Sequence, residues 1–273
     1  MALHTKGFTY ALTFSVVLAG GLLAQGPSRD DAAWKLYFDW FQQGTPEENT
    51  PQRYRAKLIS EGMTEAQANE SVALLGRLSR DHQSDYAALL FNRIYTAPAP
   101  QFNTEPNAFL VKTTADSKPG AVLDVAMGQG RNALYLASKG WQVTGFDIAE
   151  KGLELAQREA ARRGLHITTV KSDYTGFDFG HERWDLIVFS YAWVPLVDPG
   201  FIERARVSLK PGGLIVIEHP AEDPLGARDP IEDSNALLKA WSGDFRILHY
   251  EDTEGQWDWR IRKARVLRLL AQK

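Results

Sequence analysis

The spacing of apolar and polar residues changes about one third of the way along the chain. Between residues 31 and 92, apolar residues recur every three to four positions, which is typical of helices with one buried face. The segment from Thr64 to Gln67 has the form of a capping box and predicts a helix start, and another helix is expected from about Gln83 to Arg93. We therefore expect a helical N-terminal region over residues 31–96.

Five aromatic side chains fall near the start of this region. Because they have helical spacing, we interpret them as the core of the helical region rather than as a ligand cage. They are Trp34, Tyr37, Phe38, Trp40 and Phe41.

From Gly120 onward, short β-branched runs alternate with helical stretches, which is typical of a parallel sheet covered by helices on both faces. Each predicted strand ends in a glycine, an acid or a turn. The expected strands are 121–125, 142–146, 166–171, 185–189 and 214–218, the last one entered by a turn at 211–213, and the expected helices are 131–138 and 150–163.

The C-terminal pattern lacks a crossover helix. Residues 246–251 and 261–271 form two strand-like runs with a polar turn at 253–255 between them, so we expect an antiparallel hairpin. Together these elements predict the α/β class: a Rossmann-like sheet of seven strands, mostly parallel, flanked by helices, with the helical region attached. Prolines at 98, 100 and 106 indicate a linker before this domain, which we place at residues 102–273.

The N-terminus resembles a secretory leader. Lys6 precedes a mostly apolar run over residues 8–24 that ends in small residues. This predicts a signal peptide or an anchor over residues 1–24, and a start codon assigned too far upstream is the alternative. A real leader implies a periplasmic, secreted or membrane-associated protein, with no stable membrane insertion if the leader is cleaved. Without a leader, a cytoplasmic protein is expected.

The amino-acid composition excludes several kinds of functional site. The 273 residues include no cysteine, which excludes disulfides, thiolate nucleophiles and cysteine-ligated zinc. The six histidines lack metal-ligand spacing, so no metal is expected. The formal charge of -3 gives no overall basic field, so nucleic acid is not expected as a partner.

The candidate ligand-binding residues lie at the carboxyl ends of the predicted strands, because ligands of open α/β sheets bind beyond these ends. Gly128 and Gly130 follow the first strand, where glycine permits a tight turn and a close ligand approach. Asp147 ends the second strand and is placed to accept ribose hydroxyls. Asp173 follows the third and can accept from an exocyclic amino group. Together they indicate an adenosine site.

A dinucleotide site is the alternative, since residues 128–133 also match the fingerprint of nicotinamide-binding domains. Asp124 distinguishes the two. A carboxylate just before the glycine turn would crowd a pyrophosphate, but it suits a cofactor that carries an ammonium group. We therefore favour a methyl-donor site.

These residues resemble the class I S-adenosylmethionine-dependent methyltransferases, in particular the small-molecule branch typified by tellurite-resistance-type enzymes. The resemblance covers residues 102–273. It is carried by VLDVAMGQGRNALYLASKGWQVTGFD, WDLIVFS, LKPGGLIVIE and the closing RVLRLLAQK. One departure is that Ala126-Met127 stands where the family often has a small residue and cysteine.

The resemblance implies S-adenosylmethionine as cofactor and assigns roles by position. The methionine part would be bound by the glycine turn, the ribose and adenine by residues after the second and third strands, and the sulfonium would lie near the end of the fourth. The implied cofactor residues are Asp124, Ala126, Gly128, Gly130, Arg131, Asn132, Asp147, Ile148, Asp173, Tyr174 and Ser190.

Methyl transfer needs a general base only if the acceptor carries a proton at neutral pH. Tyr191 and His219 are the candidate catalytic residues, and Trp193 and Glu218 lie near the expected pocket mouth. We expect transfer to a small-molecule acceptor. A non-catalytic cofactor-binding sensor or scaffold and a nicotinamide-dependent oxidoreductase are the alternatives. The helical region is expected either to cover the pocket or to form a homodimer contact.

Overall fold

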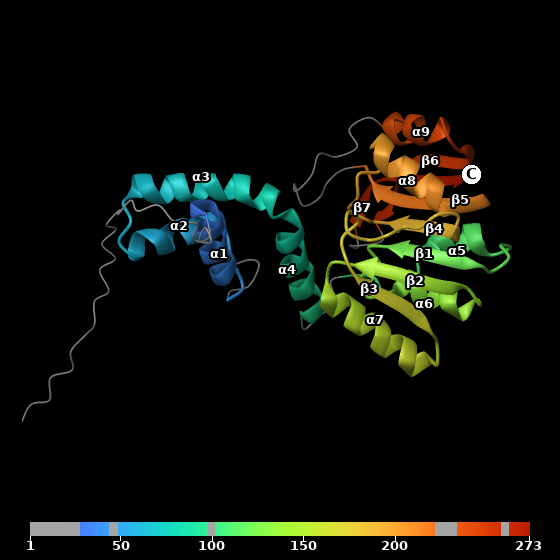
Figure 1. Cartoon of the computed structure of the whole chain (residues 1–273), viewed down its shortest axis with the longest axis horizontal. Coiled ribbons are helices and arrows are strands. Elements are labelled where there is room, and N and C mark those ends of the chain that lie inside the picture. Colours follow the sequence, from blue (N-terminus) through green and yellow to red (C-terminus); the bar gives the residue numbers. More distant parts are fainter. Residues whose placement is uncertain (1–27, 44–48, 98–101, 222–233, 258–261) are drawn as a thin grey trace, which may run out of the picture.

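The computed structural model describes residues 28–43, 49–97, 102–221, 234–257 and 262–273, and shows an α/β domain joined to a helical arm (Figure 1). The expected leader, residues 1–24, lies outside the described residues, as do residues 98–101 of the expected linker. Within the described ranges, no helix is long and apolar enough to cross a membrane.

The arm consists of four helices, coloured blue to teal in Figure 1. They are α1 (Arg29–Phe41), α2 (Pro51–Ser60), α3 (Glu65–Asp81) and α4 (Gln83–Thr96). The predicted capping box is present: the Thr64 hydroxyl accepts from the Gln67 backbone N–H, and the Gln67 side chain accepts from that of Thr64. The arm has its own core, in which Trp34, Tyr37 and Phe41 are buried. This confirms that the aromatic cluster packs the arm.

Within the described residues, the α/β domain contains a seven-stranded sheet in the order β3-β2-β1-β4-β5-β7-β6, in which β7 runs antiparallel to both β5 and β6 and the other pairs are parallel. This confirms the predicted architecture. Its strands are β1 (Ala121–Val125), β2 (Gln142–Asp147), β3 (Ile167–Lys171), β4 (Trp184–Ser190), β5 (Leu209–Pro220), β6 (Arg246–Trp257) and β7 (Arg262–Gln272). Its helices are α5 (Ala108–Thr114), α6 (Arg131–Ser138), α7 (Glu150–Arg163), α8 (Pro199–Ser208) and α9 (Ser234–Ser242).

Each face of the sheet has its own apolar core, because successive side chains of a strand point to opposite faces. In β1, Leu123 and Val125 pack with α8 and α9, whereas Val122 packs with α5, α6 and α7. Chain order reverses between β1 and β4, which are neighbours in the sheet. The crevice at their carboxyl ends is where ligands of open α/β sheets bind.

Two predicted turns are wrong in detail. Residues 211–213 lie within β5, because Leu209 already pairs with Trp184 and a register shift absorbs the Pro-Gly-Gly segment. Residues 253–255 belong to β6 and pair with β7. Their polarity comes from the position of β6 at the sheet edge, where Asp252 forms an ion pair with Arg265. Polar residues on an exposed edge strand have the same pattern as a turn.

Candidate functional site

The glycine turn after β1 has the backbone geometry expected of a ligand loop. Gly128 and Gly130 both have positive φ, at 55° and 79°, and Gly130 caps α6. A side chain at Gly128 would collide with the Tyr95 hydroxyl, and one at Gly130 would lie 2.7 Å from the Ala156 side chain. Ala126 also has positive φ, at 54°, which is uncommon for a residue with a side chain. Such strain is typical of functional sites.

Asp124 is a buried carboxylate with one oxygen unsatisfied. Its side chain is 2% exposed, and Oδ2 has no hydrogen-bond partner among the described residues. Burial raises the pKa of Asp124 to about 7, although Arg131 and the Ala133 backbone N–H act in the opposite direction. A buried polar atom without a partner costs free energy. Asp124 therefore suits a ligand that brings a positively charged donor into the cavity, such as an ammonium group.

Asp147 connects the end of β2 to the glycine turn. Its Oδ2 accepts from the Gly128 backbone N–H at 2.8 Å, and its Oδ1 accepts from that of Ala149 at 2.7 Å. Burial raises the pKa of Asp147 to about 6, and these two hydrogen bonds oppose the shift. Each carboxylate oxygen can accept a second hydrogen bond. Two adjacent hydroxyls of a ribose fit this arrangement.

Asp173 follows β3 and has a different environment. Its Oδ2 accepts from the Ser84 hydroxyl at 2.7 Å, and its Oδ1 accepts from Thr175 and Gly176. Burial alone would raise the pKa of Asp173, but the hydrogen bonds from Thr175, Ser84 and Gly176 lower it to about 2. Asp173 is therefore ionised at neutral pH and is bonded to the arm.

Most of the predicted cofactor residues line one cavity. The exception among them is Gly130, which caps α6. Of the two candidate catalytic residues, Tyr191 lines the cavity, whereas His219 does not, and its Nδ1 lies 2.8 Å from the Pro220 carbonyl oxygen. Arg131 donates to the Glu105 carbonyl and lies 3.4 Å from the Ser190 hydroxyl. The predicted residues that line the cavity are Asp124, Ala126, Gly128, Arg131, Asn132, Asp147, Ile148, Asp173, Tyr174, Ser190 and Tyr191.

Helix α4 of the arm forms part of the cavity wall, through residues that the sequence did not identify. Ser84, Phe91 and Tyr95 all line it. Their spacing of seven and four residues places them on one face of α4. The sequence predicts this helix from about Gln83 to Arg93 but does not identify which of its residues face the site. The helix is held in place where Asn92 accepts a 2.8 Å hydrogen bond from the Lys151 backbone N–H of α7.

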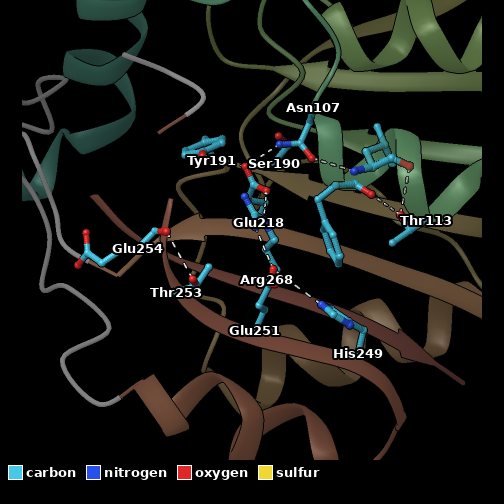
Figure 2. A network of polar contacts seen from close by, with 12 residues as sticks. Asn107, Thr113, Ser190, Tyr191, Glu218, His249, Glu251, Thr253, Glu254 and Arg268 are labelled. Carbon is cyan, nitrogen blue, oxygen red and sulfur yellow. Dashed lines mark hydrogen bonds and ion pairs between the residues drawn. The ribbon is translucent and has the colours of Figure 1, made fainter. Parts of the chain in front are cut away.

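A buried polar network lies beside the cavity, behind Tyr191 (Figure 2). Glu218 is 3% exposed, and its Oε1 accepts from the Tyr191 hydroxyl at 2.9 Å and from the Asn107 amide at 2.7 Å. Its Oε2 accepts from Arg268 at 2.6 Å, and Arg268 also pairs with Glu251. Tyr191 has a positive φ of 54°, and its backbone N–H donates to the Glu218 carbonyl. Glu218 therefore holds Tyr191 at both its backbone and its hydroxyl.

The network also reaches the cofactor loop. The Asn107 backbone N–H donates to the Asn132 side chain at the start of α6.

Among the described residues, no group of three or more histidine or acidic side chains has the geometry of a metal site.

Comparison with known proteins finds a methyltransferase domain in this part of the chain. Residues 122–213 match the family described as "Methyltransferase domain". The chain is 29% identical over 144 residues to a probable S-adenosyl-L-methionine-dependent methyltransferase, TehB, of Haemophilus influenzae, which covers 50% of each chain. It is 33% identical over 122 residues to a demethylmenaquinone methyltransferase of Thermus thermophilus, covering 43% of this chain and 54% of that one. The chain thus spans about half the length of the curated relatives that it matches.

A similarity of fold agrees with these matches. The crystal structure of TehB from Haemophilus influenzae superposes with a TM-score of 0.53 at 23% identity, covering 68% of this chain and 66% of that one. The matched family and the buried carboxylate at Asp124 favour the methyl-donor interpretation of the glycine turn over the dinucleotide interpretation. Residues 122–213 thus match a methyltransferase domain, and about half of the chain is similar to S-adenosylmethionine-dependent methyltransferases.

Proposed function

We infer that the chain transfers a methyl group from S-adenosylmethionine to a small-molecule acceptor. The observation that carries this inference is the unpaired, buried Oδ2 of Asp124 beside the glycine turn. A cofactor with an ammonium group would supply the missing donor. Asp147 would hold the ribose hydroxyls and Ile148 would contact the adenine, with Asp173 and Tyr174 at the adenine edge.

When bound, the cofactor would supply a methyl carbon attached to a positively charged sulfur. A lone pair of the acceptor would form the new bond to this carbon, and the electrons of the broken carbon–sulfur bond would stay on the sulfur. The protein's own task is then to align the acceptor and to exclude water. Helix α4 contributes to both, because its residues line the cavity and its Tyr95 hydroxyl lies against the glycine turn.

Calorimetric titration of the full chain with S-adenosylmethionine tests the proposal. The wild type is expected to bind S-adenosylmethionine and not NAD. Asp124→Asn is expected to weaken binding by about tenfold to a hundredfold, since hydrogen bonds to charged groups contribute roughly 1.5–3 kcal/mol. Asp116→Asn, which changes an exposed carboxylate before β1, is the matched control and should bind like the wild type.

The absence of binding of both S-adenosylmethionine and S-adenosylhomocysteine to the folded chain would overturn the proposal. Binding without transfer of labelled methyl to any of a broad panel of small acceptors would instead favour a cofactor-binding sensor.

A further inference from the structure

Part of the cavity has a wall of aromatic rings. Phe91 of α4 and Trp193, which follows β4, meet edge to face with ring centroids 5.4 Å apart. Phe102 lies 5.3 Å from Tyr95 and 6.5 Å from Phe91, centroid to centroid. All four rings line the cavity. Aromatic rings favour offset or edge-to-face contact with another ring, so this wall suits a flat ligand.

The charges that line the cavity select against anions. Among the described residues that line it, four are acidic and one is basic. The acidic residues are Asp81, Asp124, Asp147 and Asp173, and the basic residue is Arg131. Arg131 already donates to the Glu105 carbonyl. An anionic acceptor would meet this excess of negative charge in a partly buried site, where such repulsion is weakly screened. A neutral acceptor avoids that cost.

Tyr191 supplies a hydrogen-bond acceptor for the O–H or N–H group of a neutral acceptor. Its hydroxyl donates to Glu218 Oε1, so toward a ligand the Tyr191 oxygen can act only as a hydrogen-bond acceptor. Glu218 forms a 2.6 Å ion pair with Arg268 through its other carboxylate oxygen. In Figure 2 the side chains of Tyr191, Asn107 and Arg268 all converge on Glu218. A tyrosine that donates to a fixed carboxylate is arranged to pass a proton on.

We propose that the acceptor is a flat, neutral aromatic molecule that binds against Phe91 and Trp193 and presents an O–H or N–H group to the Tyr191 hydroxyl. This proposal rests on the proposed methyl transfer. As the acceptor gains the methyl group, its proton passes to the Tyr191 oxygen while the proton of Tyr191 passes to Glu218 Oε1. One positive charge leaves the sulfur and one proton arrives on Glu218, so charge balances.

In this arrangement Tyr191 is a catalytic residue, because it touches the acceptor, whereas Glu218 and Arg268 act through it. The left-handed backbone of Tyr191 fits this role. Two hydrogen bonds to residue 218 keep the side chain in one orientation despite the strain of its positive φ.

Binding of probe molecules to the chain saturated with S-adenosylhomocysteine tests the acceptor class without relying on turnover. The flat probes are 1-naphthol, 2-naphthol and 8-hydroxyquinoline. Cyclohexanol is the non-aromatic control and 1-naphthoate the anionic control. At least one flat probe is expected to bind about tenfold or more tightly than both controls. Phe91→Ala and Trp193→Ala should each reduce that preference, whereas Leu36→Ala, at an exposed position of α1, should not.

Transfer of labelled methyl to the probe that binds best tests the proton path. Tyr191→Phe is expected to lower turnover by about tenfold or more with S-adenosylhomocysteine affinity unchanged, and to alter the pH profile. Glu218→Gln should act in the same direction. If that variant fails to fold, because it removes the ion pair between residue 218 and the partly buried Arg268, Tyr191→Phe alone decides.

Two results would overturn the proposal: flat probes that bind no better than cyclohexanol, and bound flat probes that are methylated equally fast by the wild type and by Tyr191→Phe. Both are measured on a chain that binds S-adenosylhomocysteine. A chain that does not bind S-adenosylhomocysteine contradicts the proposed function instead, so the two failures are distinguishable.

Discussion

Single residues of the cavity differ in protonation because their hydrogen-bond partners differ. Asp124 and Asp147 are both buried, and burial raises the pKa of each, to about 7 and about 6. Asp173 receives enough hydrogen bonds to have its pKa lowered to about 2. Asp124 is thus the carboxylate whose charge changes near neutral pH, and it is the one placed for a positively charged group.

Cofactor affinity should therefore depend on the ionisation of Asp124. A group with its pKa near 7 is mostly protonated at about pH 6 and mostly ionised at about pH 8, and only the ionised form attracts an ammonium group. The ratio of wild-type to Asp124→Asn affinity for S-adenosylmethionine is expected to rise about tenfold over that range. Calorimetry on both variants checks this, and their ratio cancels the titration of the ligand itself. A ratio independent of pH would place the ammonium group elsewhere.

At the scale of the element, the cavity depends on contact between α4 and the turn after β1. Tyr95 lies directly against Gly128, so the arm and the cofactor loop fit together only if residue 128 has no side chain. The α4 face that carries Ser84, Phe91 and Tyr95 is thus part of the site, although it precedes the methyltransferase domain in the sequence.

This contact predicts coupling between the two elements. Gly128→Ala should destabilise the chain through its positive φ and through collision with the Tyr95 hydroxyl, by about 1–3 kcal/mol. Tyr95→Phe removes the colliding hydroxyl. Gly128→Ala should therefore lower the free energy of unfolding by less in the Tyr95→Phe background, while the strain from the positive φ at residue 128 remains. Urea denaturation of the four variants of this cycle measures the difference. Equal costs in both backgrounds would show that α4 does not contact the turn.

The elements differ in how well the sequence predicts them. Helices α6 and α7 begin and end at the predicted residues, because glycines stop each one. Asp124 and Asp147 were identified because strand ends are recognisable from local pattern. The contacts between Glu218 and Arg268 and between Tyr95 and Gly128 were not predicted. The first depends on the register of β5 with β7, and the second on how α4 packs, neither of which local spacing encodes.

At the scale of the whole molecule, residues of the arm and of the α/β domain line the same cavity. The arm has its own aromatic core and still contributes a wall to the site. This contact agrees with the expectation that the helical region covers the pocket. A homodimer through the arm stays a prediction, which the sedimentation of the purified chain would test.

The predicted leader also belongs to this scale. We propose that residues 1–24 direct the chain out of the cytoplasm, on the basis of Lys6 and the apolar run that follows it. Mass spectrometry of the N-terminus after cell fractionation should then find a chain trimmed after about residue 24 in the periplasmic or secreted fraction, or an intact chain in the membrane fraction. An intact chain in the cytoplasmic fraction would contradict the proposal.

The central claim is that the cavity between α4 and the ends of β1 and β4 is an S-adenosylmethionine site. The most direct test is a crystal structure of the full chain with S-adenosylhomocysteine. The account predicts that the ammonium group lies within hydrogen-bond distance of Asp124 Oδ2 or of a water bound to it, with the ribose hydroxyls on Asp147. A ligand bound elsewhere, or with its ribose away from Asp147, would contradict it.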